Sequence, residues 1–240
     1  NQSMLFGSIA TGYKAGGFGD GPAGGNNPYV PEELTAYELG WKRRFSDDRL
    51  QVNVAAFHYD YRDFQVTAIG EVMGQPSLVT VNAQRARVDG VEAEGLAVLD
   101  ERNRFDASIS FLDARYSTFR VSGDLFHPGL LVNGSMQFCA LPGDVAPYCA
   151  DYSGNRLARA PRWSATLGYE RGWSQTSGAQ WLLRVQSRYV SSHNLDYHGF
   201  ALTEQGAYTR SDLSLRYTMR AARWPRRWSR SRSTRAGSRR

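Results

Sequence analysis

The sequence predicts an all-β fold, a portion of an antiparallel transmembrane β-barrel, and three observations support this prediction. Apolar and polar residues alternate with a period of two in one segment after another, as in residues 163–170. We expect strands of roughly 10–14 residues around these segments, a length that exceeds the usual soluble strand and suits a tilted strand that crosses a bilayer. Short and long connections also alternate along the chain, as they do in barrels of the outer membrane.

About eight segments carry the alternation in chain order. They are residues 3–14, 37–42, 49–66, 77–99, 105–111, 163–169, 181–189 and 213–219. We predict tight turns at 46–49, 100–104 and 172–178, and long connections at 15–33, about 67–77, about 115–160 and 192–206. Aromatic residues near the strand ends would lie at the two membrane interfaces; they are Trp41, Phe45, Trp163, Tyr169, Trp181, Tyr189 and Tyr217.

Alternation by itself also fits a soluble β-sandwich whose apolar face lines a core. Strand length and the alternation of short and long connections favour the barrel. The physical difference between the two folds is where the apolar side chains point. In a barrel they face lipid, and in a sandwich they face a second sheet.

Composition excludes two other classes of protein. With 41% hydrophobic and 12% aromatic residues, the chain is too apolar to be disordered. The longest uncharged run, residues 125–143, contains two prolines and three glycines, so it is no transmembrane helix.

The net charge of +6 belongs to the last part of the chain. Residues 220–240 hold nine arginines and no acid, which leaves 20 basic against 23 acidic residues in 1–219. This Arg-rich tail could be a basic arm for nucleic acid or anionic lipid, a disordered segment, or the product of a shifted reading frame. The loss of alternation where another strand is due favours the frameshift. We therefore expect a partial barrel over 1–219, a disordered or frameshift-derived tail over 220–240, and no nucleic-acid partner.

Several segments have distinctive local sequences. In chain order they are residues 10–18 (ATGYKAGGF), 31–42 (PEELTAYELGWK), 52–65, 82–95 (NAQRARVDGVEAEG) and 159–163 (RAPRW). Together they resemble the C-terminal part of the β-barrel of TonB-dependent outer-membrane receptors. The resemblance covers about residues 3–219.

The resemblance implies a location in the bacterial cell outer membrane, in contact with its lipid, and a barrel of about 22 strands. The family's plug and its TonB-contacting segment are not visible here, so we expect a fragment. In the full-length protein, the TonB complex would drive active uptake of a scarce ligand, most commonly an iron–siderophore complex. Cobalamin, other metal chelates and oligosaccharides are alternative cargoes.

Two further functions remain open from the residues. Eight strands can close by themselves, which would give a self-contained outer-membrane barrel with a structural or adhesive role. A soluble carbohydrate-binding β-sandwich is the other alternative.

No motif predicts an enzyme, a cofactor or a metal site. The glycine-rich residues 16–25 lack the lysine of a phosphate-binding loop and predict a surface loop. His193, Asp196 and His198 match no standard metal-ligand spacing. Glu92 and Glu94 share one side of a strand that carries Arg85 and Arg87 earlier; this pattern fits a charged barrel lumen better than an acid–base pair.

The long connections carry two other candidate features. Cys139 and Cys149 are spaced for a local disulfide in an oxidising compartment, which would stabilise the fold by about 2–3 kcal/mol. Aromatic residues could line a mouth that receives a ligand. The candidates are Phe18, Tyr29, Tyr148 and Tyr152.

Overall fold

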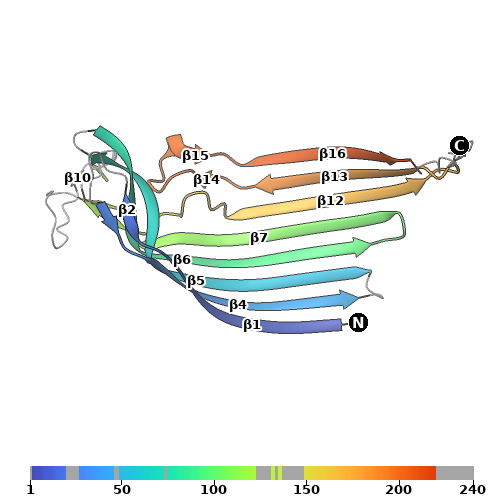
Figure 1. The fold of residues 1–240 in the computed structure, drawn as a ribbon, viewed down its shortest axis with the longest axis horizontal. Helices are drawn as coiled ribbons and strands as arrows, with labels where there is room; N and C mark the ends of the chain where they lie inside the picture. The colour runs from blue at the N-terminus through green and yellow to red at the C-terminus, as the bar shows by residue number, and fades with distance from the viewer. Residues whose placement is uncertain are drawn as a thin grey trace, which may run out of the picture.

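The computed structural model contains one large antiparallel sheet of eight strands (Figure 1). The structure describes residues 2–19, 27–45, 49–72, 75–122, 131–132, 135–136 and 149–219. The sheet consists of β1 (Gln2–Lys14), β4 (Glu32–Phe45), β5 (Leu50–Val72), β6 (Gln75–Val98), β7 (Asn103–Thr118), β12 (Trp163–Ser174), β13 (Gln180–Val190) and β16 (Tyr208–Thr218). Each strand pairs with the next one of this series, so the topology is a plain meander.

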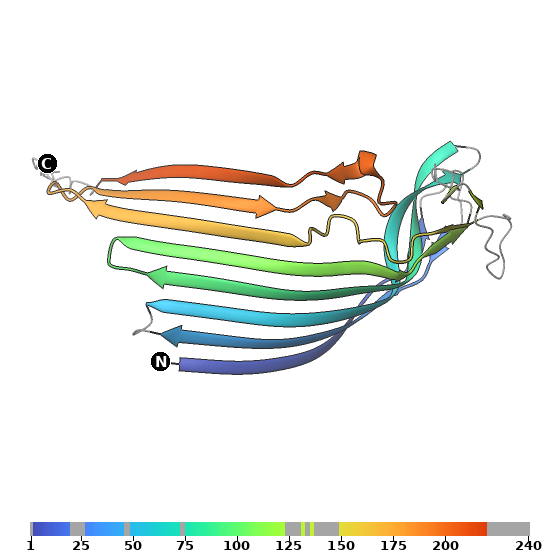
Figure 2. The same ribbon diagram turned by 180° about the vertical axis from the view of Figure 1, so that it is seen from behind.

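Short turns gather at one end of the sheet and long connections at the other (Figures 1 and 2). In the β6–β7 turn, the Asp100 carboxylate accepts hydrogen bonds from the backbone N–H groups of Arg102 (2.7 Å) and Asn103 (2.8 Å). In the β12–β13 turn, Gly178 adopts a positive φ of 82°, a conformation that glycine takes without steric cost. We call these two ends the short-turn end and the long-loop end.

The long connections contain small two-stranded ribbons. These are β2 (Gly17–Gly19) with β3 (Asn27–Tyr29), β8 (Arg120–Ser122) with β11 (Cys149–Asp151), β9 (Leu131–Val132) with β10 (Ser135–Met136), and β14 (His193–Asn194) with β15 (Glu204–Gln205). A 3-10 helix, η1 (Ala201–Thr203), precedes β15.

One predicted loop is a strand pair instead. Residues 67–77 were expected to connect two strands, but β5 continues to Val72 and β6 begins at Gln75. Thr67, Ile69 and Val72 favour a strand, and residues 67–72 pair with residues 75–80 of β6. The β5–β6 hairpin therefore extends well beyond the other strands and bends away from the sheet (Figure 1).

The side chains of the sheet divide into two faces of opposite polarity. On the apolar face, large hydrophobic side chains such as Leu5, Leu167 and Leu213 are 57–73% exposed. The register aligns one apolar row across five strands: Leu39, Ala56, Val91, Phe111 and Trp163. On the opposite, polar face lie Gln51, Asn53, Glu92, Glu94, Arg104, Asp106, Glu170, Arg184 and Asp212, at the alternate positions of the same strands.

Aromatic side chains border the apolar face at both ends. Toward the short turns, rings pair at Phe105–Tyr169 (4.6 Å between centroids) and Trp181–Tyr217 (4.5 Å). Toward the long loops, Phe111 and Trp163 lie 4.8 Å apart. Two such girdles, with apolar side chains between them, are the pattern of a lipid-facing surface.

The apolar face has no second large sheet packed against it in the part of the chain that the structure describes. Within those residues no ladder joins β1 to β16, so the two outer strands are open edges. The described residues also contain no helix long and apolar enough to cross a membrane. Residues 220–240 lie outside the described ranges, and their assignment as a tail stays a prediction.

Candidate functional site

The polar face carries an ion-pair network that joins three strands. Arg184 of β13 lies 3.2 Å from the Asp106 carboxylate of β7 and 3.6 Å from that of Glu170 on β12. All three side chains are between 25% and 33% exposed, so the charges are only partly desolvated. One arginine thus offsets two carboxylates and ties together three strands of this face.

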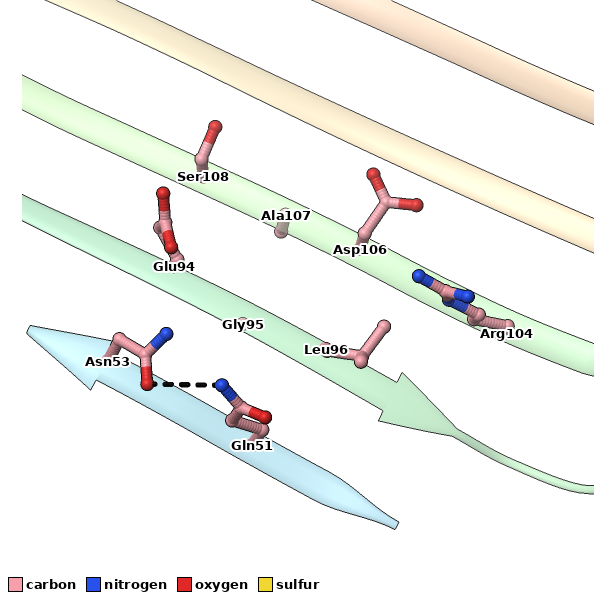
Figure 3. Close-up of a pocket in the computed structure, with 9 residues that line it drawn as sticks. All are labelled: Gln51, Asn53, Glu94, Gly95, Leu96, Arg104, Asp106, Ala107 and Ser108. Carbon is pink, nitrogen blue, oxygen red and sulfur yellow. Dashed lines mark hydrogen bonds between the residues drawn. The ribbon is translucent and has the colours of Figure 1, made fainter. Parts of the chain in front are cut away.

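Beside this network, the polar face has a pocket of about 280 Å³ (Figure 3). Figure 3 shows Glu94, Arg104 and Asp106 projecting over it from β6 and β7. On β5, the amide of Gln51 donates a hydrogen bond to Asn53 (3.3 Å). Because the lining mixes both charges with neutral hydrogen-bonding groups, it suits a wet surface better than an apolar ligand.

Glu92 and Glu94 point to this polar face, as the alternation predicts. Ser110 donates a hydrogen bond of 3.4 Å to Glu92, and a second pocket of about 190 Å³ places both carboxylates among serine and threonine hydroxyls and Arg188. Arg85 and Arg87 occupy alternate positions and therefore lie on the opposite face. The structure brings the two glutamates together as part of a polar wall and separates them from these two arginines.

At the long-loop end, the character of the sheet changes from polar to aromatic. We call Tyr116, Phe119, Tyr152 and Tyr197 the aromatic cluster; all four are at most 3% exposed. Ring centroids are 4.8 Å apart for Tyr116–Phe119, 5.5 Å for Phe119–Tyr152 and 5.1 Å for Tyr152–Tyr197.

The aromatic cluster joins the end of β7 to two connections that are far apart in sequence. Tyr116 lies near the end of β7, Phe119 directly follows that strand, and Tyr152 follows β11 in the same β7–β12 connection. Tyr197 lies in the β13–β16 connection. The Asn155 amide donates to the backbone carbonyls of Tyr197 (3.2 Å) and His198 (3.0 Å). These contacts anchor the described parts of the two connections on the end of the sheet.

Two side chains of the β5–β6 hairpin hold the first connection in place. Asn82 accepts a hydrogen bond from the Val30 N–H (3.0 Å) and donates one to the Val30 carbonyl (3.1 Å). Gln65 donates to the carbonyls of Ala15 (2.9 Å) and Val30 (3.2 Å). We call these four residues the loop latch. The alternation of apolar and polar residues did not predict the loop latch, because it does not show which backbone groups a polar strand residue such as Asn82 or Gln65 will contact.

The long-loop end also contains a hydrogen-bonded carboxylate, that of Asp151. Although its partial burial raises the pKa, the hydrogen bonds from Ser153 and Arg120 more than compensate, and the pKa lies below its usual range. The Arg120 guanidinium donates to this carboxylate over 3.1 Å. The pair fixes β11 beside β8.

The predicted ligand residues are placed in different environments. Phe18 is 70% exposed in β2, and Tyr29 is half-buried in β3. Tyr152 lies inside the aromatic cluster with 2% exposure, where its ring packs against other rings. Tyr148 and Cys139 lie outside the described residues, so the disulfide with Cys149 stays a prediction.

The histidines of the β13–β16 connection lie among hydrogen bonds within that connection. His193 contacts the Ser191 carbonyl (3.1 Å), and Asp196 accepts hydrogen bonds from the His198 backbone (3.0 Å) and the Thr203 hydroxyl (3.2 Å). Across the described ranges, no group of three potential His, Cys, Asp or Glu ligands comes together.

The fold and its two faces agree with the comparisons to known proteins. A family model described as "TonB dependent receptor-like, beta-barrel" matches residues 1–237. The chain belongs to the TonB-dependent receptor family. Members of this family are transporters and receptors of the bacterial outer membrane and are not enzymes, so the apolar face is the lipid-facing surface and the polar face lines the lumen.

Several solved structures share the fold at low identity. The ferric yersiniabactin uptake receptor FyuA from Yersinia pestis is 22% identical, with a TM-score of 0.62 over 89% of this chain and 27% of that receptor. The siderophore receptor PiuA from Acinetobacter baumannii is 19% identical (0.61; 91% and 28%), and the copper transporter OprC is 17% identical (0.56; 89% and 29%). No curated protein matches the sequence. The chain thus spans less than a third of the length of these receptors.

Proposed function

We propose that this chain is part of the barrel of a receptor that takes up an iron–siderophore complex with energy from the TonB complex. The observation that supports it best is the match of the family model over residues 1–237. Two of the solved structures with this fold are named as siderophore receptors. A third is named as a copper transporter, so cargo has to be tested and not inferred from the fold.

The two faces fit a transport role in the outer membrane. A polar lumen wall, such as the Asp106–Arg184–Glu170 network, lets a hydrated cargo pass without burying unpaired charge. At the long-loop end, packed aromatic rings hold the connections that would surround a ligand. Phe18 remains exposed there and is a candidate to contact a planar or aromatic cargo.

Uptake of radioactive iron tests the proposal. Cells expressing the receptor that carries this chain would be supplied with ⁵⁵Fe-loaded yersiniabactin, a catecholate siderophore or a hydroxamate siderophore. We expect one of these to accumulate in cells with functional TonB and not in cells without it. Cobalamin, copper and an oligosaccharide serve as the other arms, and TonB-dependent uptake of one of these alone would contradict the siderophore assignment.

A further inference from the structure

The lipid-facing surface ends in a charged belt at the long-loop end. On β6, Val91 is the last apolar residue of this face, and Asp89, Arg87 and Arg85 follow it at steps of two residues. The same change occurs on β5 and β7, where His58 and Asp113 follow Ala56 and Phe111 in register. The belt therefore continues the lipid-facing surface directly, beyond its aromatic border.

Three arginines of this belt lie side by side in the register. Arg87 is opposite Arg115 of β7, and Arg115 is opposite Arg156 through an isolated antiparallel bridge. Opposite residues of an antiparallel pair project to the same face. We call Arg87, Arg115 and Arg156 the arginine row. Like charges in opposite positions repel one another unless an anion lies between them.

The acidic residues nearby balance this charge only in part. Arg115 lies 2.8 Å from Asp113, which also faces Arg162 at 3.7 Å. Arg87 is 3.9 Å from Asp89, whose carboxylate is already 2.7 Å from His58. Asp113 and Asp89 are thus each shared between two basic groups.

Counting all described elements of the belt, guanidinium groups outnumber carboxylates. The arginines are Arg62, Arg85, Arg87, Arg115, Arg156 and Arg162, and the acids are Glu33, Asp60, Asp89 and Asp113. Arg62 and Arg85 are opposite each other and exposed. Among the described residues, no ion pair joins Arg62, Arg85 or Arg156 to an acid. The belt can therefore accept additional anionic groups.

The arginine row lies just beyond the headgroup region of a membrane, within reach of it. Arg87 lies four residues beyond Val91, or about 13 Å along the strand at about 3.3 Å per residue. With a strand tilt of about 45°, this corresponds to about 9 Å along the membrane normal. The headgroup layer begins where the hydrocarbon core ends and is about 5–7 Å thick on each side. The Arg87 backbone therefore lies just outside this layer, and its long side chain can reach back to the charged groups.

We propose that the arginine row, with Arg85, binds the phosphate groups of an anionic lipid in the outer leaflet of the outer membrane. Guanidinium groups form paired, charge-assisted hydrogen bonds with phosphate. The lipid's acyl chains would lie along the apolar face immediately beside the row. This inference rests on the family's location in the outer membrane and is independent of the cargo.

A lipid is the occupant that this location favours over a soluble ligand. The row lies on the lipid-facing surface, whereas a soluble anion entering the receptor would meet the lumen face on the other side of the sheet. A single headgroup with more than one phosphate can also span neighbouring guanidinium groups, which opposite positions on adjacent strands bring within about 5.5 Å at the Cα atoms.

Lipid binding to the receptor that carries this chain tests the proposal. The detergent-purified receptor would be titrated with bis-phosphorylated lipid A, and bound lipid would be counted by native mass spectrometry. The variant combines Arg85→Gln, Arg87→Gln and Arg156→Gln, and keeps Arg115 because it holds Asp113 and the Gly154 carbonyl. Since one basic side chain near an anionic surface strengthens binding about fivefold, we expect about 100-fold weaker binding.

Two control variants separate this site from general charge and from misfolding. Arg49→Gln, Arg102→Gln and Arg171→Gln remove the same charge at the short-turn end and should leave lipid A binding within about twofold of the unmodified receptor. Replacing Arg85, Arg87 and Arg156 by Lys keeps the charge and should retain most of the binding, because lysine also contacts phosphate. Equal losses in the first control and in the Gln variant would overturn the proposal.

Two probe arms distinguish a lipid headgroup from other anions. Lipid A without its phosphates, carrying the same acyl chains, should bind as weakly as lipid A does to the Gln variant. Millimolar inorganic phosphate should displace little lipid A. Unchanged binding of the dephosphorylated lipid, or full displacement by inorganic phosphate, would show that the row is not a headgroup site.

Discussion

At the scale of single residues, close cross-strand contacts set which side chains the lumen face tolerates. The Phe57 ring of β5 lies over Gly90 of β6, its partner in the register. A Cβ atom at position 90 would overlap atoms of that ring. The ring cannot turn away freely, because it also stacks on Tyr59 at 4.9 Å. Glycine is needed here for its missing side chain and not for an unusual φ.

Replacing Gly90 by Ala should therefore destabilise the barrel by about 1–3 kcal/mol, the usual cost of overpacking. Gly95→Ala is the matched control on the same strand, because its nearest neighbour is the Gln51 carbonyl oxygen at 4.0 Å. Both substitutions restrict the unfolded chain in the same way, so their difference isolates the clash. Urea unfolding of the receptor in lipid vesicles measures it, and equal unfolding midpoints for the two variants would refute this explanation.

At the scale of the elements, alternation predicted the strands and their faces but not their contacts with the loops. The pattern of Trp163 to Glu170 was sufficient because each side chain's face depends only on its own position in the strand. The extension of β5 to Val72 was missed because pairing with β6 stabilises it, and pairing is not visible in one segment. Likewise, the burial of Tyr152 depends on Phe119 and Tyr197, which are distant in sequence.

The loop latch shows how the β5–β6 hairpin positions the first connection. Asn82 exchanges hydrogen bonds with the backbone of Val30, and Gln84, two residues further along β6, does the same with Arg120 (3.1 and 3.3 Å). The two amides therefore anchor two different connections by the same chemistry. Each provides a control for the other.

Asn82→Ala should increase hydrogen exchange at the Val30 amide and leave the Arg120 amide unchanged. Gln84→Ala should have the opposite effect. Each lost hydrogen bond to an exposed backbone group contributes about 0.5–1.5 kcal/mol, so exchange should rise by about two- to tenfold. Hydrogen–deuterium exchange read by mass spectrometry checks both amides in one experiment. If either variant accelerated both amides equally, the connections would not be anchored independently.

At the scale of the whole molecule, the large sheet is a single curved layer (Figure 2). One of its surfaces is apolar and the other polar. Leu5 and Ile9 on the edge strand β1 are 72% and 74% exposed, more than a protein in water normally leaves uncovered over such an area. The solved receptors with this fold are more than three times as long. Lipid on one face and a wet lumen on the other account for both surfaces without a second sheet.

A barrel in the outer membrane requires that the two faces of the sheet meet different media. Spin labels at Leu167 and Leu213 on the apolar face, and at Thr166 and Ser214 on the polar face, would be compared in the receptor reconstituted in lipid bilayers. We predict that labels at 167 and 213 collide readily with oxygen dissolved in the lipid and little with a water-soluble nickel reagent, relative to those at 166 and 214. Labels at Leu167 and Leu213 that are immobile and shielded from both reagents would mean that this face packs against protein, and the barrel interpretation would be wrong.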